Sequence, residues 1–161
     1  MAVHKLVLDD AFDEVLYTLI AIHCTLEDYR LAYLLNKNLG IALARKESDL
    51  DYNEGNVSHS IYDWEDEKQL ITWSLVSNIC KTETIQKIDY KSLFDTQEKI
   101  TKTYYLLPEY KTVNYFLKIE SEFSFSKEKH ILNDVLKIPQ IVTAYSIDSS
   151  QLKSKENLIF S

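Results

Sequence analysis

The sequence of 161 residues predicts an α+β fold: a mainly antiparallel sheet with two helices on one face, ferredoxin-like with extra strands. Two helical patterns, at residues 25–39 and 126–138, are separated by several short strand patterns, and a strand pattern flanks the set at each end. No repeat or low-complexity block interrupts this order. The length suits one domain, which we expect at residues 1–148, followed by a C-terminal tail at 149–161.

The first predicted strand and the first predicted helix are the best-defined elements. Residues 15–23 are β-rich and almost all apolar, which is typical of a central strand covered on both faces. The helix at 25–39 ends at Gly40, a common stop signal, and its leucines form one stripe. Tyr29 and Tyr33 lie roughly opposite that stripe. They are either half-exposed surface residues or contacts to a second layer, such as a partner subunit.

The middle of the chain contains strand patterns separated by polar loops. Three strands are predicted, at 41–47, 58–65 and 69–78. Residues 81–101 show weak periodicity, and we expect a loop or a short irregular element there. The stretches 103–107 and 113–120 flank a proline loop and predict a hairpin. After the second helix, which ends before Pro139, residues 140–147 form the last predicted strand.

The two ends of the chain carry few targeting signals. Residues 1–10 do not resemble a signal peptide, and the apolar stretch at 15–22 is too short to span a bilayer. We therefore expect a cytoplasmic protein that does not enter a membrane. The tail is polar until Leu158-Ile159-Phe160, which either docks on the domain or a partner, or frays.

Composition and charge exclude several function classes. The chain has only two glycines and two prolines, so Gly-rich phosphate loops and dinucleotide fingerprints are absent, and no cofactor is expected. The formal net charge is −7, with −8 on residues 1–80 and +1 on residues 81–161. Such a field repels phosphate backbones, so binding to nucleic acid or to an anionic membrane is disfavoured.

Residues capable of catalysis or metal binding are present but scattered. Cys24 and Cys80 form no CxxC motif, and the four histidines show no metal-binding spacing. His23 and Cys24 are adjacent, so on a strand they point to opposite faces. The acidic loop at 49–55 does not have the register of a calcium loop, and the acidic run at 63–67 suits a solvated turn. We predict no catalytic residue and no metal site.

Tyrosines and lysines concentrate in residues 104–116. Aromatic side chains on a sheet can stack bases, so this stretch is the best argument for RNA binding, although packed antiparallel sheets contain the same pattern. The stretch supplies all the candidate binding residues: Tyr104, Tyr105, Pro108, Glu109, Val113, Asn114 and Tyr115.

Part of this stretch resembles the signature of a family of uncharacterised small bacterial proteins, the IPExxxVDY family. Pro108, Glu109, Val113 and Tyr115 match the motif, whereas Leu107 replaces its Ile and Asn114 replaces its Asp. The resemblance implies a small single-domain cytosolic protein and brings no known activity. If the family Asp were a catalytic base, the amide of Asn114 could not accept the proton. The position is therefore structural, or this chain lacks that chemistry.

Three functions are compatible with these patterns. We rank first a non-enzymatic intracellular binding or assembly protein that binds an unknown protein partner or a second copy of itself. The alternative is a small enzyme that uses carboxylates or a His/Cys pair. The second alternative is an RNA-binding α+β module.

Overall fold

The computed structural model describes residues 17–52, 57–87, 97–121 and 127–160. Within these residues the main sheet has six strands, and every neighbouring pair is antiparallel. Their spatial order is β10 (Ile141–Ile147), β1 (Tyr17–Cys24), β9 (Tyr115–Ser121), β6 (Ile71–Ser77), β5 (Ile61–Asp66) and β2 (Ala44–Arg45). The first four have the order of a ferredoxin-like sheet, with one helix crossing between β1 and β6 and another between β9 and β10. The predicted α+β class is confirmed.

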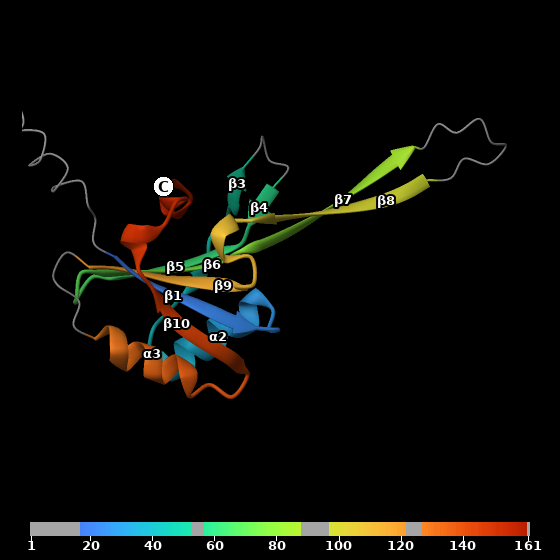
Figure 1. Cartoon of the computed structure of the whole chain (residues 1–161). Coiled ribbons are helices and arrows are strands. Elements are labelled where there is room, and N and C mark those ends of the chain that lie inside the picture. Colours follow the sequence, from blue (N-terminus) through green and yellow to red (C-terminus); the bar gives the residue numbers. More distant parts are fainter. Residues whose placement is uncertain (1–16, 53–56, 88–96, 122–126, 161) are drawn as a thin grey trace, which may run out of the picture.

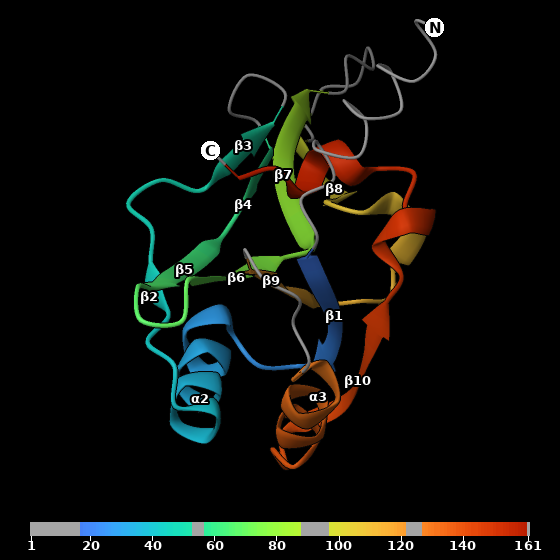
Figure 2. The same ribbon diagram turned by 90° about the vertical axis from the view of Figure 1, so that its left-hand side faces the viewer.

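Both helices, α2 (Asp28–Leu39) and α3 (Glu128–Leu136), cover the same face of the sheet, as predicted (Figures 1 and 2). Helix α2 ends at Gly40, whose positive φ of 65° suits a residue without a Cβ atom. The helices and this sheet face share a helix-side cluster of buried residues, which includes Ile20, Ile22, Leu31, Leu35, Leu75, Leu117, Val135 and Ile138. No helix of the described residues is both long and apolar enough to cross a membrane.

The opposite face of the sheet is covered by the turn at residues 106–113 and by the C-terminal tail. The tail contains two short 3-10 helices, η2 (Ser149–Gln151) and η3 (Lys155–Leu158). It contributes Leu152 and Leu158 to a tail-side cluster of buried residues, which also contains Leu19, Ala21, Val76, Leu106, Leu107, Val113, Phe116 and Ile147. The buried Lys118 donates from Nζ to the carbonyl of Leu158 at 2.6 Å, so the tail lies on the domain.

A two-stranded arm projects from the body (Figure 1). It consists of β7 (Ile79–Lys87) and β8 (Gln97–Tyr105), which pair along their whole length. The prediction of a loop or an irregular element at 81–101 is therefore wrong for its described residues. The arm is exposed on both sides over most of its length, so no face selects apolar residues and the sequence lacks the alternation that marks a half-buried strand.

Three other sequence predictions need correction. The stretches 103–107 and 113–120 do not pair, because β8 pairs with β7 whereas β9 lies between β1 and β6. The strand predicted at 58–65 is split into β5 and β4 (Val57–His59), which pairs with β3 (Leu50–Tyr52). Of residues 41–47, only Ala44 and Arg45 pair with a strand. The sequence pattern marks extended backbone in each case but does not identify its partner.

The packing of the tail predicts a contrast between two neighbouring residues. Leu158 is buried, whereas Ile159 is 73% exposed. We expect Leu158→Ala to lower the free energy of unfolding by about 2–4 kcal/mol, because it leaves a cavity in the tail-side cluster. We expect Ile159→Ala to change it by no more than about 0.5 kcal/mol. Urea denaturation measures both, and equal effects would show that the tail does not lie on the sheet as described.

Candidate functional site

The turn at residues 106–113, which contains part of the predicted site, is held by the side chain of Asn78. This residue follows β6 and is fully buried. Its side-chain nitrogen donates to the carbonyl oxygens of Tyr110 and Val113, both at 2.8 Å. Its Oδ1 accepts from the N–H of Leu107 at 3.0 Å. The sequence pattern did not reveal Asn78, because a polar residue at the end of a strand does not indicate a partner so distant along the chain.

Pro108 and Glu109 lie at the surface of this turn. Pro108 opens the 3-10 helix η1 (Pro108–Tyr110), where its restricted φ suits the first position. Glu109 Oε2 accepts hydrogen bonds from the backbone N–H groups of Lys153 at 2.9 Å and Ser154 at 3.2 Å. Burial acts to raise the pKa of Glu109, but these hydrogen bonds outweigh it and hold the pKa below its ordinary value. The ionised carboxylate of Glu109 therefore holds the tail through its hydrogen bonds to two backbone N–H groups.

The next motif residues join the turn to β1 and to the start of α2. Val113 is buried in the tail-side cluster. Asn114 Oδ1 accepts from the N–H of Cys24 at 3.1 Å, a bond that an aspartate could also accept. The Tyr115 hydroxyl donates to the carbonyl of Leu26 at 2.7 Å, and burial raises the pKa of this tyrosine strongly. Each of these residues therefore has a structural partner.

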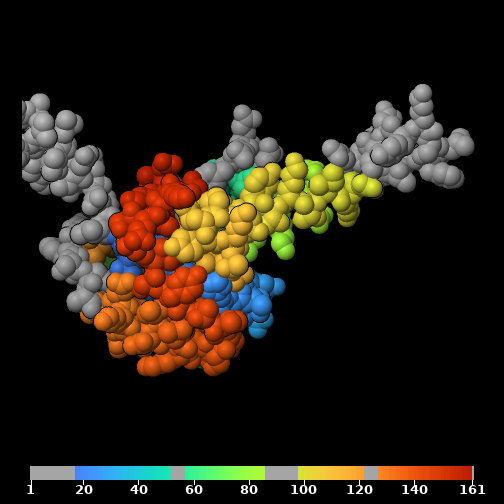
Figure 3. Space-filling model, viewed as in Figure 1, coloured from blue at the N-terminus to red at the C-terminus, as the bar shows by residue number. Residues whose placement is uncertain are grey.

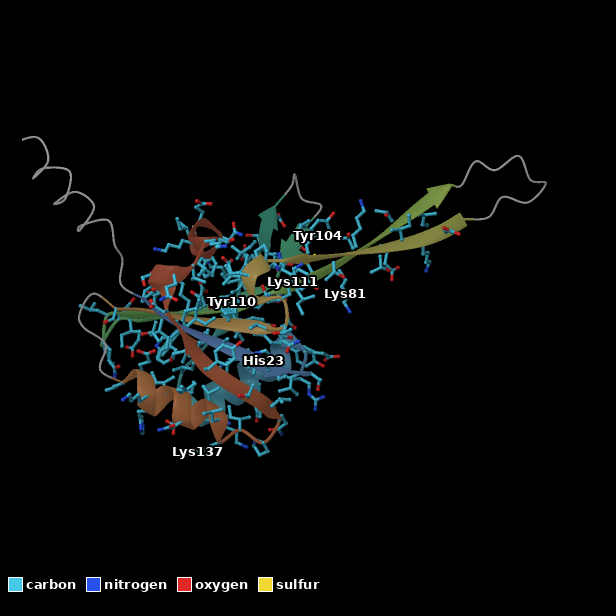
Figure 4. The ribbon with its side chains drawn as sticks, in the orientation of Figure 1. His23, Lys81, Tyr104, Tyr110, Lys111 and Lys137 are labelled. Atoms are coloured by element: carbon cyan, nitrogen blue, oxygen red, sulfur yellow. The ribbon has the colours of Figure 1, made fainter. Side chains whose placement is uncertain are left out.

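The aromatic residues do not assemble into one base-stacking platform. Tyr104 lies at the base of the arm (Figure 4), where it is opposite Cys80. Tyr105 is opposite Ile79 on the same pair of strands. Adjacent strand residues point to opposite sides, so these two rings do not share a face. Tyr115 packs against the helix-side cluster. The sheet face that stacks bases in RNA-binding domains of this architecture is here covered by the turn and the tail.

The histidines and cysteines form no nucleophile–base pair among the described residues. The Nε2 of His23 lies 3.1 Å from the hydroxyl of Tyr145. Cys24 is buried, and burial raises the pKa of its thiol, which makes it a weak nucleophile. Cys80 lies on the arm. Burial lowers the pKa of His59, whose Nδ1 lies 2.9 Å from the carbonyl oxygen of Ser77.

The acidic runs form turns and ion pairs where the structure describes them. Asp66 Oδ1 accepts from the N–H groups of Lys68 and Gln69 in the turn after β5, at 3.1 and 3.3 Å. Asp63 pairs with Lys46 at 3.1 Å. Within the described part of the chain, no three His, Cys, Asp or Glu side chains lie close enough to hold a metal ion. Part of the 49–55 loop lies outside the described residues.

A shallow groove lies beside α2. Its volume is about 400 Å³, and it is lined by Leu26, Tyr29, Arg30, Tyr33, Leu34 and Gln140. Tyr29 and Tyr33 are 58% and 64% exposed. They are surface residues of this chain, and their rings give the groove an aromatic wall. The structure shows no second layer over them within the described residues.

The two outer strands of the main sheet differ in charge. At one edge, β2 has only two residues, and Arg45 pairs there with Asp28 and Asp49, so charge and shortness block further pairing. At the other edge, β10 has seven residues and no charged side chain. Val142 is 78% exposed. Figure 3 shows β10 at the surface between α3 below it and the tail above it. This strand is the best candidate interaction site.

The hydrogen bonding of β1 determines which backbone groups of β10 point outward. The carbonyl of Ile22 accepts from the N–H of Asn114 at 3.1 Å, so Ile22 directs its backbone groups toward β9. Ala144 lies opposite Ile22 in the register of β1 and β10. The pair is therefore non-hydrogen-bonded, and the N–H and C=O of Ala144 point away from β1. Hydrogen-bonded and non-hydrogen-bonded pairs alternate along the two strands, so the N–H and C=O of Ser146, two residues later, also point away from β1.

Comparisons with known proteins identify no relative of this chain. No family model matches it, and neither does a curated protein or a solved structure. A functional proposal therefore rests on the geometry of the residues themselves, above all on the uncharged outer strand.

The role of Asn114 predicts a contrast between two substitutions. Asn114→Asp keeps an acceptor for the N–H of Cys24, so we expect the free energy of unfolding to stay within about 0.5 kcal/mol of the wild type. Asn114→Ala leaves that N–H without its partner, and we expect a loss of about 1–2 kcal/mol. Urea denaturation at neutral pH measures both. An aspartate variant as unstable as the alanine variant would contradict the assigned role.

Proposed function

We propose that the protein is a non-enzymatic binding and assembly protein that engages its partner by strand addition to the free edge of β10. The observation that carries the proposal is that this outer strand has seven residues, no charged side chain, and outward-facing backbone groups at Ala144 and Ser146. Exposed strand edges are templates for pairing with another chain. The opposite edge of the same sheet, at β2, is short and charged, so it does not compete.

The side chains around the edge support binding rather than catalysis. Val142 and Tyr145 supply exposed apolar surface on β10. The His23 ring lies beside that of Tyr145, with centroids 5.5 Å apart. Each backbone hydrogen bond across such an edge contributes about 0.5–1.5 kcal/mol, and the apolar contact adds to this. Aromatic residues such as Tyr145 are enriched in protein interfaces.

Two further parts of the proposal concern location and family. Cys24 and Cys80 are free thiols, which suits a reducing compartment, and we place the protein in the cytoplasm. We also propose membership of the IPExxxVDY family. This proposal is supported by three of the residues that match the family motif. Glu109, Val113 and Tyr115 each have a structural role in this fold.

The proposal is tested by blocking the edge without breaking the sheet. In Ser146→Pro the proline removes an N–H that does not bond to β1, so we expect the fold to persist and strand addition to fail. The tagged wild-type chain is added to lysate of the source cell, together with a second copy that carries another tag. We expect the tagged chain to capture a partner. Ser146→Pro should capture at least tenfold less of that partner, measured by quantitative mass spectrometry.

The matched control is Ile85→Lys on the arm, an exposed apolar residue of another strand. We expect this variant to capture the same partner as the wild type. Equal capture by Ser146→Pro and the wild type, with both variants folded by circular dichroism, would show that the edge of β10 is not the interaction surface.

A further inference from the structure

Among the described residues, no strand pairs with the outer edge of β10, and its outward backbone groups allow a symmetric pairing. Its two outward-facing residues, Ala144 and Ser146, flank Tyr145. In an antiparallel pair related by a two-fold axis through Tyr145, Ala144 of each copy lies opposite Ser146 of the other. We propose that the strand added to β10 is β10 of a second copy, in this register. This inference rests on the proposed function and names its partner.

Only this register satisfies the outward backbone groups of both copies. Shifting the centre to Ala144 would place Ser146 opposite Val142, where the register of β10 against β1 is irregular. Shifting the centre to Ser146 would place Ala144 opposite Asp148, whose carbonyl already accepts from the N–H of Gln151. The register centred on Tyr145 gives two hydrogen-bonded residue pairs and therefore four hydrogen bonds.

The side chains of β10 are compatible with self-pairing. Ala144 and Ser146 are small, so they allow close approach where they lie opposite each other. Tyr145 would meet its own copy in a non-hydrogen-bonded pair, the closer type of cross-strand pair, and aromatic pairs at such positions are favourable. In the same register, Thr143 would lie opposite Ile147 of the other strand.

The absence of charged side chains on β10 is compatible with a second copy as the partner. Each chain carries a net charge of −7, so two copies repel each other except where the contact itself is uncharged. Charged residues make up 27% of the chain, yet β10 contains none. Like charges that lie opposite each other destabilise paired strands. A charged residue on β10 could meet its own copy across the two-fold axis, and the sequence of β10 avoids this.

The register is tested by cross-linking. In a Cys80→Ser background, Tyr145→Cys places a thiol opposite its own copy, at a Cβ separation of about 4.5–5.5 Å. Mild oxidation should convert most of this variant to a covalent dimer. The matched control is Thr143→Cys, whose copies would lie about 13 Å apart along the strands, so it should remain monomeric on a non-reducing gel.

Light scattering of the wild-type chain gives an independent readout that does not depend on the folding of the cysteine variants. We expect the mass of a dimer at tens of micromolar, and of a monomer for Ser146→Pro. A mixture of Thr143→Cys and Tyr145→Cys that cross-links when neither does alone would overturn the register, because it requires the centre at Ala144.

The outcome also separates this inference from the proposed function. A monomeric wild type that shows no cross-link, but still captures a different protein through an intact edge of β10, overturns self-pairing alone. A monomeric wild type whose partner capture is unaffected by Ser146→Pro overturns both proposals.

Discussion

The buried side-chain amide of Asn78 is the interaction on which the rest of the structure depends. It accepts from the N–H of Leu107 and donates to the carbonyls of Tyr110 and Val113, so it ties both ends of one turn to the end of β6. A buried amide without these partners would cost about 1–3 kcal/mol for each unsatisfied group. The turn therefore lies across the sheet, presents Glu109 to the tail, and directs the chain from the arm back into β9.

Closing this face leaves little of the main sheet open. The helices cover one side, and the turn and the tail cover the other. An α+β sheet covered on both sides can add a partner only along its edges, and the edge at β2 is short and occupied by the ion pairs of Arg45. Among the described residues of the main sheet, the uncharged edge of β10 is thus the remaining place for backbone pairing, which is why the proposed function rests on it.

Local patterns in the sequence predicted the elements that bury an apolar face. The apolar run of β1, the leucine stripe of α2 with Gly40, and the helix before Pro139 all appear where expected. The arm was not predicted, because both of its sides are largely exposed to solvent and its strands therefore lack the alternation of apolar and polar residues. The segment at 104–115 stood out by composition, but its roles depend on distant partners such as Leu26 and Lys153. The candidate edge was not predictable either, because a strand pattern does not reveal whether the strand lies at the centre or the rim of a sheet.

The central claim, that the outward backbone groups of β10 pair with another copy, is tested most directly by amide hydrogen exchange at residue resolution over a range of protein concentrations. The amides of Thr143 and Tyr145 face β1, so they should be protected at every concentration. Those of Ala144 and Ser146 should exchange rapidly in dilute solution and slow by at least tenfold as the dimer forms. Rapid exchange of Ala144 and Ser146 at concentrations where light scattering shows a dimer would contradict the account, because the copies would then meet through another surface.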